Sequence, residues 1–95
     1  MVRYLTLLKF TDQGIKALQK SAARAGAFRA AAAKSGVTVE AQYWTTGAYD
    51  GAVVLSAENE GAVLRCIASL AALGDVRPET LRALDAKEFE AIGGK

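Results

Sequence analysis

The sequence predicts an α+β domain whose elements follow one another as strand, helix, strand, strand, helix, strand. Residues 37–44 alternate apolar and polar side chains with the period of two that marks a half-buried strand. Residues 13–34 and 60–73 instead space their apolar side chains by three and four, as amphipathic helices do. A short turn after residue 44 then joins two strands into an antiparallel hairpin.

The first two elements are a strand and a long helix. Residues 3–10 (RYLTLLKF) are mostly apolar, and they stop at Thr11 and Asp12, either of which can cap a helix. We expect one helix from Gln13 to Lys34, ended by Gly36 in a left-handed conformation. The expected apolar stripe consists of Ile15, Leu18, Ala22, Ala25, Phe28 and Ala32. The basic residues expected mainly on other faces are Lys16, Lys20, Arg24 and Lys34.

A hairpin follows in the middle of the chain. Strict alternation over 37–44 (VTVEAQYW) places two sets of side chains on opposite faces of a strand. One set is Val37, Val39, Ala41 and Tyr43, and the other is Thr38, Glu40, Gln42 and Trp44. Residues 45–48 turn the chain, and 49–57 (YDGAVVLSA) return as the second strand.

The last third predicts a second helix, a fourth strand and a short final helix. Residues 58–60 open the second helix, and Gly74-Asp75 closes it. Its stripe is Val63, Leu64, Ile67, Leu70 and Ala71. Residues 76–84 form a strand, and Pro78 assigns it to a sheet edge because proline cannot donate to a ladder. Asp85 can cap a helix that carries Phe89 and Ile92. The whole order is that of a single ferredoxin-like domain over residues 1–95.

One face of this sheet is not covered by any helix of the same chain. Right-handed crossovers put both long helices on the same face. The opposite face has an area on the order of 300 Å², close to the largest apolar patch that a monomer exposes. Bulky side chains alternate on both faces of the first strand, with Leu5 and Leu7 opposite Tyr4 and Leu8. We therefore expect a homodimer, or a higher homo-oligomer, that pairs through the open faces. The alternative is a monomer whose last helix folds over part of that face.

The composition excludes several functional classes. The formal charge of +2 and the lack of any long Lys/Arg cluster argue against nucleic-acid binding. The sequence contains no histidine, so it lacks the commonest proton shuttle and metal ligand, and we expect no metal and no cofactor. A single cysteine and the absence of a long apolar run favour a cytoplasmic protein that does not enter a membrane.

Three separated segments, YLTLLKFTDQGIKAL, YWTTGAYDGAVVLSA and GDVRPETLRAL, resemble the GYD domain family, small bacterial proteins of the dimeric α/β-barrel superfamily. The motif that names the family is present as Gly47-Ala48-Tyr49-Asp50. The resemblance implies a ferredoxin-like fold and assembly through the open sheet faces. It implies little chemistry, although the superfamily includes cofactor-free monooxygenases that bind substrate between sheet and helices. Some relatives degrade haem with a histidine, which this sequence lacks.

The candidate site lies around the hairpin. Trp44, Tyr49 and Asp50 can form the lip of a cleft, with Asp50 as the one candidate base of an enzyme. A structural interpretation is compatible with this: Gly47 supplies a positive φ, Tyr49 packs across the turn, and Asp50 accepts backbone amides. Tyr4 and Arg82 are further ligand-binding candidates if the fourth strand pairs with the first.

Two other groups of residues have simpler explanations. Arg77, Arg82 and Lys9 can attract an anionic ligand, but a solvated edge with ion pairs to Glu79 or Asp75 is the interpretation that we favour. Cys66 is expected to be buried and inert.

Two functions remain open. One is a homo-oligomeric module that binds a small apolar or aromatic molecule between sheet and helices. The other is a cofactor-independent enzyme, similar to a monooxygenase or an isomerase, acting in the same cleft.

Overall fold

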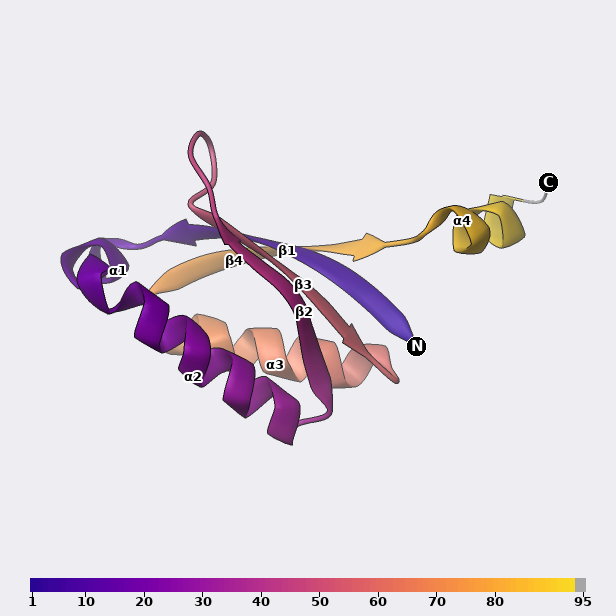
Figure 1. The fold of residues 1–95 in the computed structure, drawn as a ribbon, viewed down its shortest axis with the longest axis horizontal. Helices are drawn as coiled ribbons and strands as arrows, with labels where there is room; N and C mark the ends of the chain where they lie inside the picture. Colours follow the sequence, from indigo (N-terminus) through magenta and orange to yellow (C-terminus); the bar gives the residue numbers. More distant parts are fainter. Residues whose placement is uncertain (94–95) are drawn as a thin grey trace.

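The chain forms a four-stranded antiparallel sheet with two long helices packed on one of its faces, as the computed structural model of residues 1–93 shows (Figure 1). The strands are β1 (Val2–Phe10), β2 (Val37–Trp44), β3 (Gly51–Ala57) and β4 (Val76–Ala83). The helices are α1 (Asp12–Lys16), the 3₁₀ turn η1 (Leu18–Lys20), α2 (Ser21–Lys34), α3 (Glu60–Ala72) and α4 (Ala86–Gly93). This is the predicted ferredoxin-like arrangement. No helix within residues 1–93 has the length and apolar character that crossing a bilayer requires.

The sheet order is β2-β3-β1-β4, so β1 is central and β4 lies at an edge. β1 pairs with both β3 and β4, with Tyr4 opposite Leu55 on one side and Arg82 on the other. Pro78 therefore sits on an edge strand, as its missing N–H donor predicts.

The core lies between the sheet and helices α2 and α3. Its largest fully buried side chains are Leu55, Val37, Val53, Val63 and Thr6. Thr6 is the polar member of this group, and its hydroxyl forms a hydrogen bond of 3.2 Å with that of Thr80 on β4. The bond allows a polar group to be buried on the central strand without losing its hydrogen-bond partner.

The predicted helix from Gln13 to Lys34 is not continuous, and this part of the prediction was wrong. Helix α1 ends at Ala17, where φ is −113° and ψ is 34°, and one 3₁₀ turn leads into α2. The break places the start of α1 against Asp75, in the turn that precedes β4, while α2 packs along the sheet. Ile15 and Leu18, expected on the buried stripe, are consequently 57% and 50% exposed, and the stripe is buried only farther along α2, at Ala32.

A β-bulge in β2 overturns a second expectation, the alternation of side chains along this strand. The register shifts between Val39 and Ala41, so that Gln42 pairs with Val53 and Trp44 with Gly51. Residues directly opposite each other in a sheet point to the same face. Trp44 therefore points toward the helices, together with Val39, whereas simple alternation had placed it on the other face.

The start of α1 is fastened to the turn between α3 and β4. Thr11 donates its N–H to the carbonyl of Asp75 at 3.0 Å and its hydroxyl to the carbonyl of Gly74 at 2.5 Å. The Gln13 amide donates to Asp75 Oδ1 at 2.8 Å. Gly14 lies so close that a Cβ on it would overlap the Asp75 carbonyl oxygen. The contact thus requires a residue without a side chain at position 14.

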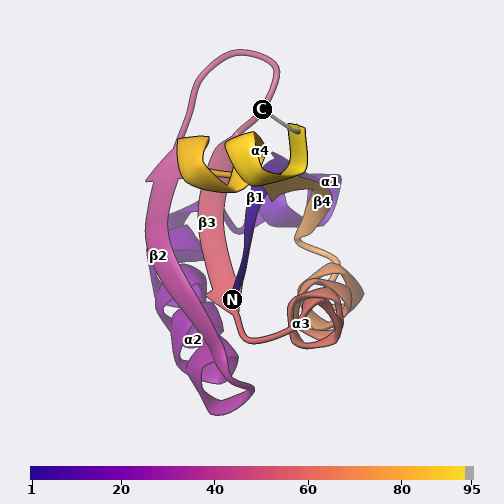
Figure 2. The same cartoon turned by 90° about the vertical axis from the view of Figure 1, so that its right-hand side faces the viewer.

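Helix α4 begins in a reciprocal cap and does not fold over the open face. The Asp85 side chain accepts from the N–H of Glu88 at 2.7 Å, and the Glu88 side chain accepts from the N–H of Asp85 at 2.9 Å. The helix lies beyond the end of the sheet, at one extreme of the molecule's long axis (Figures 1 and 2). Its apolar residues Phe89 and Ile92 are 64% and 71% exposed. The monomer with a self-covered open face, which was the alternative to the dimer, is therefore not what the structure shows.

Substituting Gly14 tests the contact between α1 and the α3–β4 turn. We expect Gly14→Ala to lower the free energy of unfolding by about 1–3 kcal/mol, the usual cost of overpacking, because the new Cβ meets backbone rather than a movable side chain. Urea denaturation of the variant and the wild type measures this difference.

Gly26→Ala is the matched control for Gly14→Ala. Gly26 lies within α2 and a Cβ there meets nothing within 4 Å, so the substitution should stabilise the protein by about 0.5–1 kcal/mol through helix propensity. Equal effects of the two substitutions would contradict the assignment of Gly14 to a close contact.

Candidate functional site

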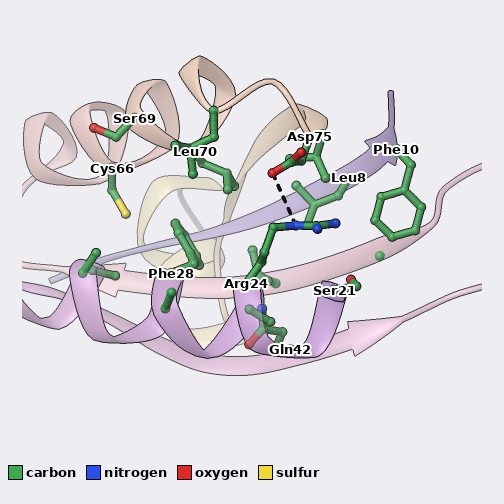
Figure 3. Close-up of a pocket in the computed structure, with 18 of the residues that line it drawn as sticks. Leu8, Phe10, Ser21, Arg24, Phe28, Gln42, Cys66, Ser69, Leu70 and Asp75 are labelled. Carbon is green, nitrogen blue, oxygen red and sulfur yellow. Dashed lines mark ion pairs between the residues drawn. The ribbon is translucent and has the colours of Figure 1, made fainter. Parts of the chain in front are cut away.

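A cavity of about 640 Å³ lies between the sheet and the two long helices (Figure 3). β1, β2 and β3 contribute Leu8, Gln42, Trp44 and Val53 to its walls. Helices α2 and α3 contribute the facing walls, and Figure 3 shows Phe28 of α2 and Leu70 of α3 projecting into the space between them. The volume falls within the range of roughly 300–1,000 Å³ that is typical of small-molecule sites.

The small side chains of α2 explain why this space is open. Between Ser21 and Lys34 the helix has eight alanines and one glycine, and Phe28 is its only large apolar residue. Ala25, Ala31 and Ala32 line the cavity where longer side chains would have filled it. The space opens to solvent beside the exposed Trp44, so water occupies it when no ligand is bound.

Arg24 forms the polar end of the cavity. Its Nε lies 3.3 Å from Asp75 Oδ2, and its Nη1 donates to the carbonyl of Ala17 at 2.9 Å. Nη2 is buried and has no hydrogen-bond partner among the described residues. Figure 3 shows the guanidinium extending from α2 beneath Leu8. The sequence pattern had placed Arg24 mainly on a face away from the apolar stripe, and the break before α2 turns it inward instead.

Trp44 lies at the exposed rim of the cavity. Its indole Nε1 donates to the hydroxyl of Ser21, the first residue of α2, at 2.9 Å. The side chain is 53% exposed even though it contributes to the cavity lining. The bond joins the end of β2 to the start of α2, so one tryptophan both borders the cavity and ties two of its walls together.

Asp50 also lines the cavity, but its carboxylate is engaged by the backbone. Oδ2 accepts from the N–H of Phe10 at 2.9 Å, and the N–H of Asp50 itself donates to the carbonyl of Leu8 at 2.8 Å. Its carbonyl accepts from Thr45 across the hairpin loop at 3.0 Å. These bonds correspond to the structural interpretation of Asp50, in which it accepts neighbouring amides.

Tyr49 lies on the other side of the sheet. Its hydroxyl donates to Glu79 Oε1 at 2.7 Å, and the ammonium of Lys9 lies 5.8 Å from the centre of its ring. The hydrogen bond to the Glu79 carboxylate raises the pKa of Tyr49, because the carboxylate favours the neutral phenol. The loop between β2 and β3, in which Gly47 has the expected positive φ of +102°, rises on the side away from α2 and α3 (Figure 1).

Tyr4 and Arg82 meet each other, as pairing of β4 with β1 predicts, and neither is among the residues that line the cavity. The guanidinium carbon of Arg82 lies 5.8 Å from the Tyr4 ring centre. Tyr4 is buried, and this burial, together with the neighbouring Glu60 carboxylate, raises its pKa. Of the five predicted ligand-binding residues, the structure brings Trp44 and Asp50 to the cavity and places Tyr4, Tyr49 and Arg82 elsewhere.

Cys66 borders the cavity from α3. It is buried, as expected, and burial raises the pKa of the thiol. A raised pKa keeps the group protonated near neutral pH, which makes it a poor nucleophile. Among residues 1–93, no cluster of three or more His, Cys, Asp or Glu side chains is arranged to hold a metal ion.

Sequence reasoning missed Arg24 and Asp75. Asp75 was expected only as a helix-ending residue or as a surface partner for Arg77, Arg82 or Lys9, yet it pairs with Arg24. One signal was available: Ser21, Arg24 and Phe28 follow one another at spacings of three and four and so share one face of a helix.

Removing the Asp50 carboxylate tests its structural role. Asp50→Ala leaves the N–H of Phe10 without its partner, and we expect a loss of about 1–3 kcal/mol in the free energy of unfolding. Asp50→Asn keeps an acceptor oxygen and should lose less than half as much. Thr46→Ala, in the same exposed loop, is the control and should change stability little. Urea denaturation that finds Asp50→Ala as stable as the wild type would contradict this role.

Comparison with known proteins agrees with the fold. The model of the GYD domain matches residues 4–92. A protein of Thermus thermophilus named "Glutamine synthetase and cystathionine beta-lyase binding protein" is 33% identical over 92 residues, covering 96% of this chain and 97% of its own. The crystal structure of TTHA0845 from the same organism has the same fold, with a TM-score of 0.59 and 23% identity over 90% of this chain and 96% of that one. Because the family match spans almost the entire sequence, the protein belongs to the GYD domain family.

Proposed function

We propose that this protein is a cytoplasmic, homodimeric binding module that holds a small apolar molecule between its sheet and its helices. The observation that carries the proposal is the cavity of about 640 Å³. Its walls are mainly aliphatic and aromatic, and the ion pair of Arg24 with Asp75 lies at one end (Figure 3). Small-molecule sites commonly combine these two features.

A binding role agrees better with the polar residues than the enzymatic alternative does. A cofactor-independent enzyme in this cleft would need a free base, and Asp50 was the one candidate. Its carboxylate accepts the N–H of Phe10, so it is committed to holding the loop. The other reactive group at the cavity, the Cys66 thiol, has a pKa that burial raises rather than lowers.

The open face of the sheet supports the dimer. The strand pairing places Leu5, Leu7 and Val54 on the face opposite the helices, and Leu81 of β4, which is 43% exposed, continues this surface. A second copy is the occupant that we infer, because the apolar side chains of this face on two identical molecules can be buried together by pairing about a two-fold axis. The exposed Phe89 and Ile92 of α4 lie beyond the end of the sheet, where a partner can reach them.

A second candidate function is the binding of other proteins. The Thermus thermophilus relative is named for binding glutamine synthetase and cystathionine beta-lyase, and its match to this chain is nearly full-length. By this similarity we propose that the dimer can also bind a metabolic enzyme. Calorimetric titration with purified glutamine synthetase and cystathionine beta-lyase of the source organism tests the idea, and heat changes no larger than those of dilution for both would exclude it.

Charge on the open face should break the dimer. We expect the wild type to have twice the mass of one chain by light scattering after gel filtration. Leu5→Lys should have the mass of a single chain, because the residues opposite it, Leu81 and Val54, offer a buried ammonium group no partner. Leu64→Lys, at an exposed position on α3 in the helical layer, is the control and should remain dimeric. A wild type that runs as a monomer at micromolar concentration would contradict the dimer.

Filling the cavity should abolish ligand binding. A thermal-shift screen of small apolar and aromatic compounds should find molecules that raise the melting temperature of the wild type by mass action. Ala25→Phe puts a ring into the space that Ala25 lines, so the same compounds should no longer shift its melting temperature. Ala30→Phe, at an exposed position on the same helix, should respond like the wild type. The binding role fails if no compound class shifts the wild type.

A further inference from the structure

The polar end of the cavity contains one buried N–H donor without a hydrogen-bond partner among residues 1–93. Arg24 Nη2 is buried and without a partner among residues 1–93, while Nε and Nη1 of the same guanidinium are held by Asp75 and the Ala17 carbonyl. An unpaired buried N–H group is costly and rare in folded proteins. An acceptor oxygen of a molecule in the cavity would satisfy it.

The charges around Arg24 indicate whether the acceptor oxygen of the ligand is neutral or anionic. The guanidinium is already neutralised by the Asp75 carboxylate, whose Oδ2 lies 3.3 Å from Nε. A carboxylate ligand would therefore bring a second negative charge next to Asp75, whose side chain is only 18% exposed. A carbonyl oxygen would accept the hydrogen bond and leave the site neutral. Arg65 also lines the cavity, but it is exposed, so water solvates its charge.

The side chains around the guanidinium indicate what the rest of the ligand is like. Leu8 and Phe10 lie on the sheet side of Arg24, and Phe28 and Leu70 border the next part of the cavity (Figure 3). Trp44 adds an aromatic wall at the rim. An apolar, preferably aromatic, body fits this lining, because apolar surface that is removed from water there meets apolar side chains.

We propose that the cavity selects neutral carbonyl compounds, in which a ketone, ester or amide oxygen accepts from Arg24 Nη2 and an aromatic or aliphatic body occupies the space between α2, α3 and the sheet. This inference rests on the proposed binding function and adds the ligand class and the residue that recognises it. Arg24 is the specificity determinant, and Asp75 sets the preference for a neutral ligand over an anion.

Three ligands of nearly the same shape test the selection. Benzylacetone carries a ketone, hydrocinnamate carries a carboxylate at neutral pH, and n-butylbenzene carries neither. Calorimetric titration of the wild type should find benzylacetone binding at least about tenfold tighter than n-butylbenzene, the gain expected from one hydrogen bond to a charged donor. Hydrocinnamate should bind no better than the hydrocarbon. Fluorescence of Trp44, the only tryptophan, gives an independent measurement at the cavity rim.

Two variants assign the effect to the charge pair. The double variant Arg24→Met with Asp75→Asn removes both charges together, so that neither is left buried alone, and it should bind benzylacetone and n-butylbenzene equally well. Asp75→Asn alone keeps the Arg24 donor but leaves the site positive, so hydrocinnamate should gain about tenfold over its wild-type affinity. If the double variant does not fold, Asp75→Asn and the three ligands measured on the wild type still test the roles of Asp75 and Arg24.

The outcomes separate this inference from the binding function. Equal affinity of the wild type for benzylacetone and n-butylbenzene would overturn the role of Arg24 and leave a purely apolar site. Tightest binding of hydrocinnamate to the wild type would overturn the preference for neutral ligands. Failure of all three ligands to bind, together with a negative thermal-shift screen, would overturn the binding function itself.

Discussion

The contact between the start of α1 and the Gly74–Asp75 turn positions the first helix, the end of α3 and the polar end of the cavity. Thr11, Gln13 and Gly14 all meet the turn, through three hydrogen bonds to it and one close backbone approach. Asp75 then uses its remaining carboxylate oxygen to hold Arg24. The first helix of the chain, the end of α3 and the polar end of the cavity are therefore fixed at one point, and a shift there would move the guanidinium relative to the space that it borders.

The alanine content of α2 has two opposite consequences. Alanine is the best helix former, so the helix can persist although it buries little apolar surface. The same short side chains leave the cavity unfilled. A sequence optimised for stability alone would place leucine or isoleucine at positions such as Ala25 and Ala31, because filling a void is among the simplest ways to stabilise a protein. The retained space is consistent with a site that a ligand occupies.

Much of the fold was predictable because its signals are local. The edge position of Pro78, the positive φ of Gly36 and Gly47, and the caps at Thr11 and Asp85 depend on residues close together in sequence, and the structure confirms them. Most strand limits also agree within one residue, but the strand predicted over 49–57 starts only at Gly51, because Tyr49 and Asp50 belong to the loop. The bulge after Val39 was not predictable, since the residues that follow it alternate as well as those before it. The break at Ala17 was not predictable either, because Ala17 is a good helix former and no proline follows it closely, while Gly14, three residues earlier, is compatible with a continuous helix.

The candidate site was harder to predict for the same reasons. The aromatic hairpin attracted attention, and Trp44 and Asp50 do reach the cavity. Trp44 does so because the bulge turns it toward the helices. Arg24 depends on the helix break and on Asp75, which is 51 positions away in the chain. The position of Arg24 at the cavity therefore results from contacts between residues far apart in the sequence, and composition and periodicity do not predict such contacts.

The motif Gly47-Ala48-Tyr49-Asp50 connects the open face of the sheet with the rim of the cavity. Tyr49 binds Glu79 on the open face, and the next residue, Asp50, holds the N–H of Phe10 beside the cavity. Both residues lie in the loop just before β3, so the step from Tyr49 to Asp50 carries the chain from one side of the sheet to the other. A second copy seated on the open face would contact the side on which Tyr49 lies and so restrain the loop that ends in Asp50. The motif is then best understood as a structural link between the rim of the cavity and the surface through which we propose that two copies pair, with Asp50 holding the N–H of Phe10 at the cavity side.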